Sequence, residues 1–216
     1  MSQPSEDVLR GQIVSTMRAM DQRGLNRGTS GNVSARFGDG LLVTPSGVVP
    51  DELTADSIVF VDAAGETTAE AARPSSEWRM HAGLYARRPD VGAVVHCHSR
   101  HATILACAGK PIPPLHYMVG VSGRASVPLA PYQPFGSVEL ADAVADAMEG
   151  GMACLMANHG LITVARSLSR ALAIAEEMEE QAAVYCGTLA IGGPNLLSDA
   201  QMDDIFERFK TYGQKR

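Results

Sequence analysis

Hydrophobic residues recur every three or four positions in several stretches of the chain, and this spacing predicts helices. The N-terminal stretch shows it clearly, because Leu9, Ile13 and Met17 fall on one helical face. Near the other end, S-D-A-Q from Ser198 matches a capping box, which marks a helix start. The predicted helices cover residues 6–23, 77–88, 100–108, 137–148 and 168–189, and a sixth begins at Ser198.

Shorter apolar runs between these helices predict β-strands, and residues 91–97 have the length of a buried one. Residues 28–49 are rich in Gly, Ser, Thr and Pro, so we predict hairpins and loops there. The predicted strands cover residues 41–44, 57–61, 91–97, 152–156 and 161–164. The mixture lacks a strict βαβ repeat. It predicts an α/β fold, with residues 1–216 as a single domain whose central mixed or antiparallel β-sheet is flanked by helices.

Length and charge exclude several classes of function. A chain of 216 residues can bury the core of one sizeable domain. The net charge of −6 argues against nucleic acid as a partner, because polyanion binding uses a basic face. No apolar stretch approaches the length that spans a bilayer, and residues 1–12 lack a signal-peptide pattern. We therefore expect no membrane partner and a cytoplasmic location.

Cysteine placement agrees with a reducing compartment. The four cysteines form no C-x-x-C pair, and each lies in an apolar stretch. We expect small buried hydrophobic residues and no disulfide framework. They are Cys97, Cys107, Cys154 and Cys186.

The sequence V-V-H-C-H carries the clearest chemical signal. Alternation along the predicted strand puts His96 and His98 on one face and Cys97 on the other. There are two interpretations of these imidazoles. They supply two ligands of a metal site, or they are hydrogen-bonded residues of the core. His159, in a predicted turn between two strands, can supply the third ligand of a catalytic metal site with an open position. Three other histidines fit no worse by spacing alone, namely His81, His101 and His116.

Glu77 stands at the predicted start of a helix, directly after two serines that can cap it. A carboxylate there is either a functional group or a partner for the helix dipole. Three polar segments, residues 28–34, 44–47 and 74–76, combine glycine or a helix start with hydroxyl groups. Such segments suit an anion, so a small phosphorylated substrate is plausible.

Taken together, these segments resemble the class II aldolase/adducin family. The resemblance runs over nearly the whole chain, in a specific order and spacing. Its motifs are G-T-S-G-N-V-S, T-P-S-G, P-S-S-E-W-R-M-H, V-V-H-C-H-S, I-P-P-L-H-Y-M, A-P-Y-Q-P-F-G-S, N-H-G-L-I and F-K-T-Y-G. The resemblance implies a zinc-dependent aldehyde-lyase of carbohydrate metabolism, although ligand type does not exclude Mn²⁺, Co²⁺ or Fe²⁺.

The resemblance also implies roles for particular residues. His96, His98 and His159 would bind the metal, and Glu77 would bind it in the resting state and act as acid/base. Tyr117 would reach in from a neighbouring subunit of a homotetramer with interfacial active sites and protonate the aldehyde oxygen, and Tyr212 would close over the substrate. The implied binding residues for substrate and phosphate are Thr29, Gly31, Asn32, Ser46, Gly47, Ser75, Ser76 and Tyr212.

The implied reaction is cleavage of a ketose 1-phosphate, L-fuculose 1-phosphate or a close analogue, to dihydroxyacetone phosphate and a small aldehyde such as lactaldehyde. A close alternative substrate is 5-deoxyribulose 1-phosphate. The same scaffold also carries ribulose-phosphate 4-epimerases and sugar-phosphate dehydratases and decarboxylases. Adducin-type heads keep the fold as a scaffold without the metal ligands, which this chain retains.

Overall fold

The computed structural model describes residues 4–68 and 71–212. Two parts of the sequence predictions lie outside these ranges. The first is residues 1–3, which belong to the N-terminal segment that lacks a signal-peptide pattern. The second is Gly213, the last residue of the F-K-T-Y-G motif.

A seven-stranded sheet forms the centre of the protein, in the order β3-β2-β1-β4-β7-β6-β5. Neighbouring strands are antiparallel except β5 and β6, which are parallel, so the sheet is mixed. The strands are β1 (Asn32–Phe37), β2 (Gly40–Val43), β3 (Val59–Val61), β4 (Ala93–Cys97), β5 (Leu129–Ala130), β6 (Ala153–Met156) and β7 (Gly160–Ala165). The strand that carries His96 therefore lies in the middle of the sheet.

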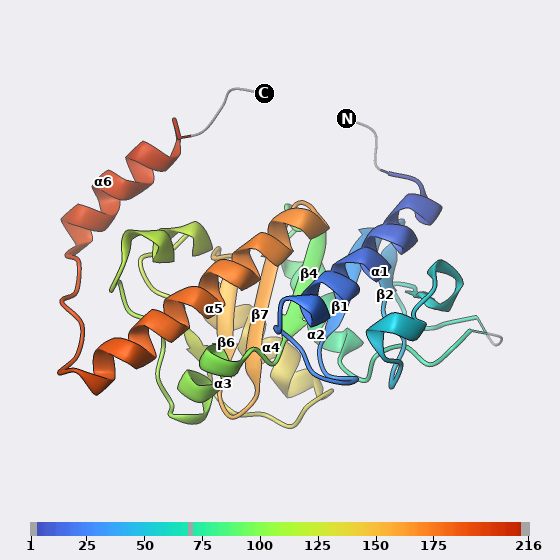
Figure 1. Ribbon diagram of the computed structural model, residues 1–216. Helices are drawn as coiled ribbons and strands as arrows, with labels where there is room; N and C mark the ends of the chain where they lie inside the picture. The colour runs from blue at the N-terminus through green and yellow to red at the C-terminus, as the bar shows by residue number, and fades with distance from the viewer. Residues whose placement is uncertain (1–3, 69–70, 213–216) are drawn as a thin grey trace.

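Helices cover both faces of this sheet (Figure 1). One buried cluster joins α1, α3 and α5 to one face, and a second joins α2 and α4 to the other. α6 projects away from these layers and packs on η3. The helices are α1 (Glu6–Gln22), α2 (Trp78–Arg87), α3 (Arg100–Cys107), α4 (Val138–Met148), α5 (Leu168–Ala190) and α6 (Asp199–Phe209), with 3₁₀ helices η1 (Pro50–Glu52), η2 (Ala55–Ser57) and η3 (Tyr117–Ser122). No helix in the described ranges is both long and apolar enough to cross a membrane.

Alternation along β4 divides its side chains between the two cores. Val95 and Cys97 pack in the cluster under α1, α3 and α5, whereas Val94 packs with α2 and α4. His96 shares the face of Val94, because side chains two positions apart on a strand point the same way. Cys97 lies opposite and fully buried, and burial raises the pKa of its thiol to about 11.

The segment predicted as hairpins and loops contains a full strand, β1, which pairs with β2 in a hairpin and with β4. Its polar residues Asn32 and Ser34 are buried rather than exposed. They bond to side chains of α2, as described below. Polar positions in a strand normally suggest a face toward solvent. The hydrophobic pattern of residues 32–37 therefore did not predict a buried strand.

The start of α2 also differs from the prediction. Trp78 is its first residue and Glu77 its N-cap, with no side-chain capping bond. Ser75 instead accepts the backbone N–H of Glu77 at 3.3 Å. Ser75 therefore holds the backbone of Glu77 and leaves the carboxylate free to turn toward the end of the sheet.

The prediction that all four cysteines are buried is wrong for two of them. Cys97 and Cys154 are buried, but Cys107 is exposed and Cys186 is partly exposed. Cys107 is the last residue of α3 and comes directly after the buried Leu105 and Ala106. Cys186 is partly buried and packs against the edge of the core.

Candidate metal centre

Three histidines from two chain segments meet at the end of β4. His96 lies within the strand, His98 directly follows it, and His159 lies in the turn between β6 and β7. Their candidate ligand atoms all lie within 4.8 Å of one another. The Nε2 atoms of His96 and His98 are 3.0 Å apart.

A backbone carbonyl orients the ring of His96, and a tight turn positions His159. The Nδ1 of His96 lies 2.9 Å from the carbonyl oxygen of Leu161, so Nδ1 carries the hydrogen and Nε2 keeps its lone pair. His159 follows Asn158, which has φ +56°, a left-handed conformation that asparagine tolerates. A Cβ on Gly160 would lie 2.5 Å from the carbonyl oxygen of Cys97. Glycine there lets the turn that carries His159 approach the end of β4.

Glu77 faces the histidines from the start of α2. Its Oε1 lies 3.1 Å from Nε2 of His159, and its Oε2 lies 3.3 Å from Nε2 of His96. Asn32 donates a hydrogen bond from Nδ2 to Oε2 at 2.9 Å. Burial alone would raise the pKa of this carboxyl, but His96 and His159 together outweigh it and hold the pKa well below the usual range. Glu77 is thus a carboxylate in this arrangement.

The arrangement fits a divalent cation. Partial burial, followed by the charges that His96 and His159 would carry, lowers the pKa of His98 to about 4, so its imidazole is neutral near pH 7. Three imidazole rings gathered this closely beside a carboxylate are typical of a metal site. The Oε1 of Glu77 is buried and has no hydrogen-bond partner among the described residues. Nitrogen and carboxylate donors suit zinc and related ions.

The other three candidate ligands lie elsewhere and have protein partners. His81 is fully buried between Asn32 and Ser34. His101 pairs with Glu179 of α5 at 2.9 Å. His116 accepts a hydrogen bond from the N–H of Met118.

The three polar segments come together beside this centre. An isolated bridge pairs Pro45 with Pro74, and Ser75 donates its N–H to the carbonyl oxygen of Thr44 at 2.9 Å. Thr44 in turn donates its N–H to the carbonyl oxygen of Val33, next to Asn32, and its hydroxyl oxygen accepts the N–H of Val33. Thr29, Ser46, Gly47 and Ser76 are exposed, Gly31 is half-buried, and Asn32 and Ser75 are buried.

Asn26, which the sequence did not single out, joins this loop to the histidines. Its Oδ1 accepts the backbone N–H of His98 at 3.2 Å. A Cβ on Gly31 would lie 2.3 Å from the Asn26 Nδ2, and Gly31 has φ +76°. A glycine at position 31 therefore allows Asn26 to hold His98.

A cavity of about 300 Å³ opens over the centre, lined by Glu77, His98, His159 and Ser76 together with Tyr132 and Phe135. The two aromatic residues were missed as individual site residues, although A-P-Y-Q-P-F contains both. Aromatic residues directly after prolines, Tyr132 after Pro131 and Phe135 after Pro134, were the available signal.

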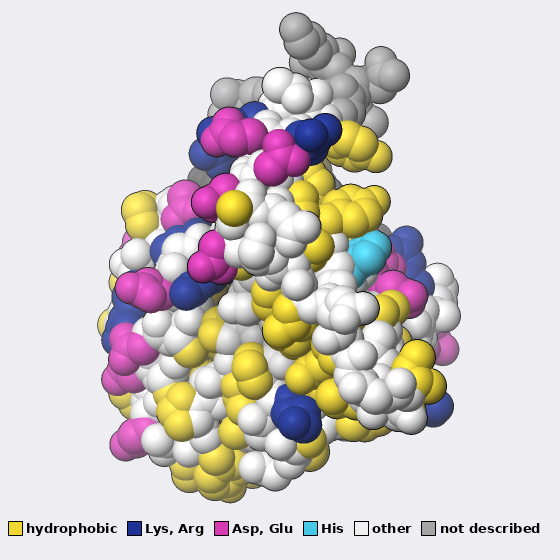
Figure 2. Space-filling model, turned by 90° about the vertical axis from the view of Figure 1, so that its left-hand side faces the viewer, with side chains coloured by type: hydrophobic (Ala, Val, Ile, Leu, Met, Phe, Trp, Pro, Cys, Tyr) yellow, Lys and Arg dark blue, Asp and Glu magenta, His cyan; other side chains and the backbone are white. Residues whose placement is uncertain are grey.

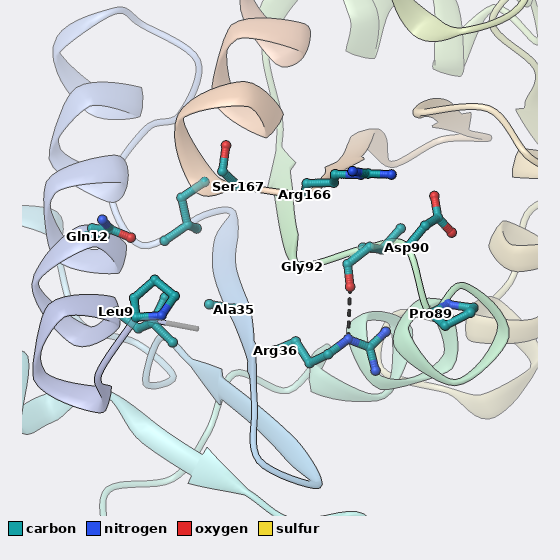
Figure 3. A pocket seen from close by; sticks show the side chains of 12 residues that line it. Leu9, Gln12, Ala35, Arg36, Pro89, Asp90, Gly92, Arg166 and Ser167 are labelled. Atoms are coloured by element: carbon teal, nitrogen blue, oxygen red, sulfur yellow. Dashed lines mark hydrogen bonds between the residues drawn. The ribbon is translucent and has the colours of Figure 1, made fainter. Parts of the chain in front are cut away.

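A larger cavity of about 600 Å³ lies near Gly92, before β4 begins (Figure 3). The histidines lie at the other end of that strand. Its Arg36 donates to the carbonyl oxygen of Val91 at 2.9 Å, and its Asp90 pairs with Arg88. Because Arg36 and Asp90 are already partnered and none of the described histidines lines this cavity, the chemistry points to the smaller one.

Tyr117 and Tyr212 do not line the cavity over the histidines in the described part of the chain. Tyr117 begins η3 and is 49% exposed, and Tyr212 is 87% exposed. One protomer alone does not bring these two residues to the metal centre.

Comparison with known proteins identifies the family. The family model described as the class II aldolase and adducin N-terminal domain matches residues 11–186. This chain belongs to that family. Over 209 residues it is 46% identical to a 5-methylthioribulose-1-phosphate/5-deoxyribulose-1-phosphate aldolase of Rhodospirillum rubrum, covering 97% of this chain and 94% of that protein.

Two further relatives agree with this class II aldolase assignment. An L-fuculose phosphate aldolase of Escherichia coli O6:H1 is 46% identical over 206 residues, or 95% of each chain. A solved structure of L-fuculose 1-phosphate aldolase superposes with a TM-score of 0.91 at 36% identity, covering 94% of this chain and 96% of that one. The predicted fold and the predicted aldolase class are confirmed.

Proposed function

We propose that this class II aldolase cleaves a ketose 1-phosphate to dihydroxyacetone phosphate and a small aldehyde. The substrate is L-fuculose 1-phosphate, which gives lactaldehyde, or a close analogue such as 5-deoxyribulose 1-phosphate. Relatives with both names share 46% identity with this chain. The observation that carries the proposal is the carboxylate of Glu77 placed against three convergent histidines.

His96, His98 and His159 would hold a divalent cation, with Glu77 as a further ligand in the resting enzyme. Zinc suits three imidazoles and a carboxylate, and manganese, cobalt and iron remain compatible with them. When bound, the ion supplies Lewis-acid charge for the oxygen that becomes negative as the carbon–carbon bond breaks.

Glu77 moves the proton at carbon. In the direction of synthesis, its carboxylate takes a proton from the hydroxymethyl carbon of dihydroxyacetone phosphate, which then attacks the aldehyde. Tyr117 of a neighbouring subunit donates its phenolic proton to the aldehyde oxygen as the new bond forms. Cleavage uses the same two transfers in reverse. The contacts that lower the pKa of Glu77 also weaken it as a base, so the carboxylate gains basicity when it turns from His96 and His159 to the substrate.

The polar segments beside the centre bind the substrate phosphate. They combine backbone N–H groups of Gly31 and Gly47 with the hydroxyls of Ser46, Ser75 and Ser76, and Thr29 lies on the same loop. The bridge between Pro45 and Pro74 supports this role, because it holds two of the segments together. Asn32 retains one amide hydrogen beyond its bond to Glu77.

The enzyme assembles as a cyclic homotetramer in which Tyr117 and Tyr212 complete neighbouring sites. Exposed aromatic residues of this kind gain from burial against a second copy. Figure 2 shows hydrophobic side chains gathered on the face from which α6 projects. The link between α5 and α6 leaves Ile191 and Leu196 exposed near it. The four free thiols suit the reducing cytoplasm.

An aldehyde panel tests the proposal. The purified enzyme is incubated with dihydroxyacetone phosphate and lactaldehyde, glyceraldehyde, glycolaldehyde, acetaldehyde or methylthioacetaldehyde, with and without a chelator. We expect condensation with lactaldehyde or acetaldehyde, loss of activity on chelation, and release of dihydroxyacetone phosphate from the matching ketose 1-phosphate. Interconversion of epimers without release of that product would identify an epimerase instead.

A further inference from the structure

A chain of buried polar groups extends from Glu77 into the layer between the sheet and α2. Nδ2 of Asn32 lies 2.9 Å from Oε2 of Glu77, and Oδ1 of Asn32 lies 2.6 Å from Nε2 of His81. The Nδ1 of His81 lies 2.7 Å from Oγ of Ser34, which lies 2.8 Å from the hydroxyl of Tyr85. All five side chains are buried. We call these residues the Glu77 relay.

Two regular patterns build this relay. Glu77, His81 and Tyr85 are spaced four residues apart, which places them on one side of α2 and its N-cap. Asn32 and Ser34 are two apart on β1 and share the face toward α2. The two elements therefore present matching rows of polar groups inside an otherwise apolar layer.

The hydrogen bonds of the relay run in one direction. An ionised Glu77 only accepts, so the amide of Asn32 turns Nδ2 to it and Oδ1 to His81. His81 must then carry its hydrogen on Nε2, and as a neutral ring it accepts from Ser34 at Nδ1. Ser34 accepts in turn from Tyr85. Burial, more than the charge of His96, lowers the pKa of His81 to about 3, so the ring is neutral at ordinary pH.

The far end of the relay is fixed. The guanidinium of Arg36 lies over the ring of Tyr85, 4.8 Å from its centre. Arg36 also donates to the carbonyl oxygens of Tyr85 and Arg88 at 2.7 and 2.8 Å, which ties the end of α2 to β1. Tyr85, at the far end of the relay, therefore has little freedom to move.

At the near end, the relay distinguishes the two oxygens of Glu77. Oε2 receives the bond from Asn32, while Oε1 is buried without a hydrogen-bond partner among the described residues and faces His159. We propose that His81 is a positioning residue, which orients the Asn32 amide so that Glu77 is anchored by Oε2 and presents Oε1 for proton transfer.

This inference rests on the acid/base role proposed for Glu77. Without His81, the Asn32 amide oxygen has no hydrogen-bond donor if the amide keeps its orientation, and a buried unpaired oxygen costs free energy. The amide therefore no longer has one preferred orientation. The carboxylate then samples unproductive orientations. Such a change lowers turnover more than substrate binding, because Asn32 is only one of the groups proposed to hold the phosphate, whereas the carboxylate acts directly at the reacting carbon.

The test compares His81→Phe with His81→Gln, because glutamine can still donate to Asn32 and phenylalanine cannot. For the phenylalanine variant we expect kcat to fall by about tenfold to a hundredfold, as for other outer partners of catalytic groups. KM for the ketose 1-phosphate should change less than kcat, the metal content should stay near wild type, and glutamine should restore most of kcat. His101→Phe makes the same substitution in a histidine outside the relay and should leave kcat unchanged.

Nitrogen NMR of ¹⁵N-histidine-labelled, metal-free wild-type protein supplies a second readout, which does not depend on activity or on the variants folding. We expect the His81 signals of a neutral ring with its hydrogen on Nε2. A hydrogen on Nδ1, or normal kcat in folded His81→Phe, would overturn the relay. The proposal would also be overturned if kcat fell only in proportion to lost metal, or if His101→Phe lowered kcat by the same factor. If instead the wild type shows no aldolase activity while the NMR result holds, the proposed function fails and the hydrogen-bond order of the relay stands.

Discussion

Asn32 and His96 are register partners across the antiparallel strands β1 and β4. This pairing places the end of the G-T-S-G-N loop beside a proposed metal ligand, and Asn32 reaches from there to the carboxylate of Glu77. One strand pair thus joins the proposed phosphate loop, the proposed acid/base group and the candidate metal centre. The predictions below probe these links separately.

Replacement of Glu77 by glutamine should separate metal binding from turnover. Three histidines remain to hold the ion, but an amide cannot take a proton from carbon. We expect Glu77→Gln to keep most of its metal and to lose turnover by about a hundredfold to ten-thousandfold. Elemental analysis and steady-state kinetics on the same sample check this. Near-normal turnover would exclude the acid/base role.

Removal of a histidine should instead abolish metal and activity together. We expect His96→Ala and His159→Ala to lose the ion, because each supplies one of three imidazoles. His101→Ala is a matched control, since His101 lies on α3 and pairs with Glu179 of α5, outside the proposed site. A full metal complement in either ligand variant would refute the proposed ligand set.

Subunit mixing tests whether Tyr117 acts on a neighbouring site. Tyr117→Phe and Glu77→Gln should each be nearly inactive alone. After dissociation and random reassociation in equal amounts, about a quarter of the interfacial sites should contain both intact residues and regain activity. As a control, Glu77→Gln mixed with His159→Ala should regain nothing, because one subunit supplies both residues. No gain in the first mixture would place Tyr117 outside a shared site.

Gly160→Ala should disturb the centre without removing any ligand. The added Cβ would lie 2.5 Å from the carbonyl oxygen of Cys97 and 3.0 Å from Cδ2 of His98, so backbone must shift. We expect about 1–3 kcal/mol of lost stability and weaker metal binding. Gly187→Ala is the control, since a Cβ added there in α5 would have no described atom within 4 Å, and it should be neutral or stabilising. Denaturant unfolding and metal titration of both variants check this.

The metal-free protein should lose stability in acid partly through His81. Its folded pKa of about 3 lies below the ordinary value of 6.5, chiefly through burial and then His96, with Glu77 opposing. Between these values the unfolded chain binds a proton that the folded chain does not, so stability falls as pH falls. The contribution from pH 7 to pH 5 is about 2 kcal/mol. Urea unfolding at both values should show a smaller loss for His81→Gln. An equal loss would show that His81 does not contribute.

Elements with strong periodicity were predictable from the sequence. The helix predicted over residues 168–189 is α5 (Leu168–Ala190), and the apolar run at 91–97 contains β4. The common face of His96 and His98 also followed from alternation, and their Nε2 atoms are 3.0 Å apart. These features depend on neighbours in the sequence, which is why local pattern reveals them.

Features that depend on tertiary packing were not predictable in the same way. Strand β1 was concealed because Asn32 and Ser34 are polar yet buried against α2. Spacing alone did not distinguish His159 from His81, since the difference lies in which turn or helix reaches the end of β4. The spacings N-x-S and E-x-x-x-H-x-x-x-Y put these polar residues on one face of a strand and one face of a helix. They did not show that the two faces pack together, so Ser34 and Tyr85 could not be recognised as partners of His81.

The position of Cys97 affects which ions the proposed centre selects. It stands between two ligands in the sequence, but it faces the opposite core, and burial keeps its sulfur protonated. A soft thiolate is thereby withheld from the site, and copper(I) loses the donor it prefers. The remaining borderline donors discriminate little among zinc, cobalt, manganese and iron. Occupancy then follows the supply of each ion in the cell, and oxidants that attack thiols leave the ligand set intact.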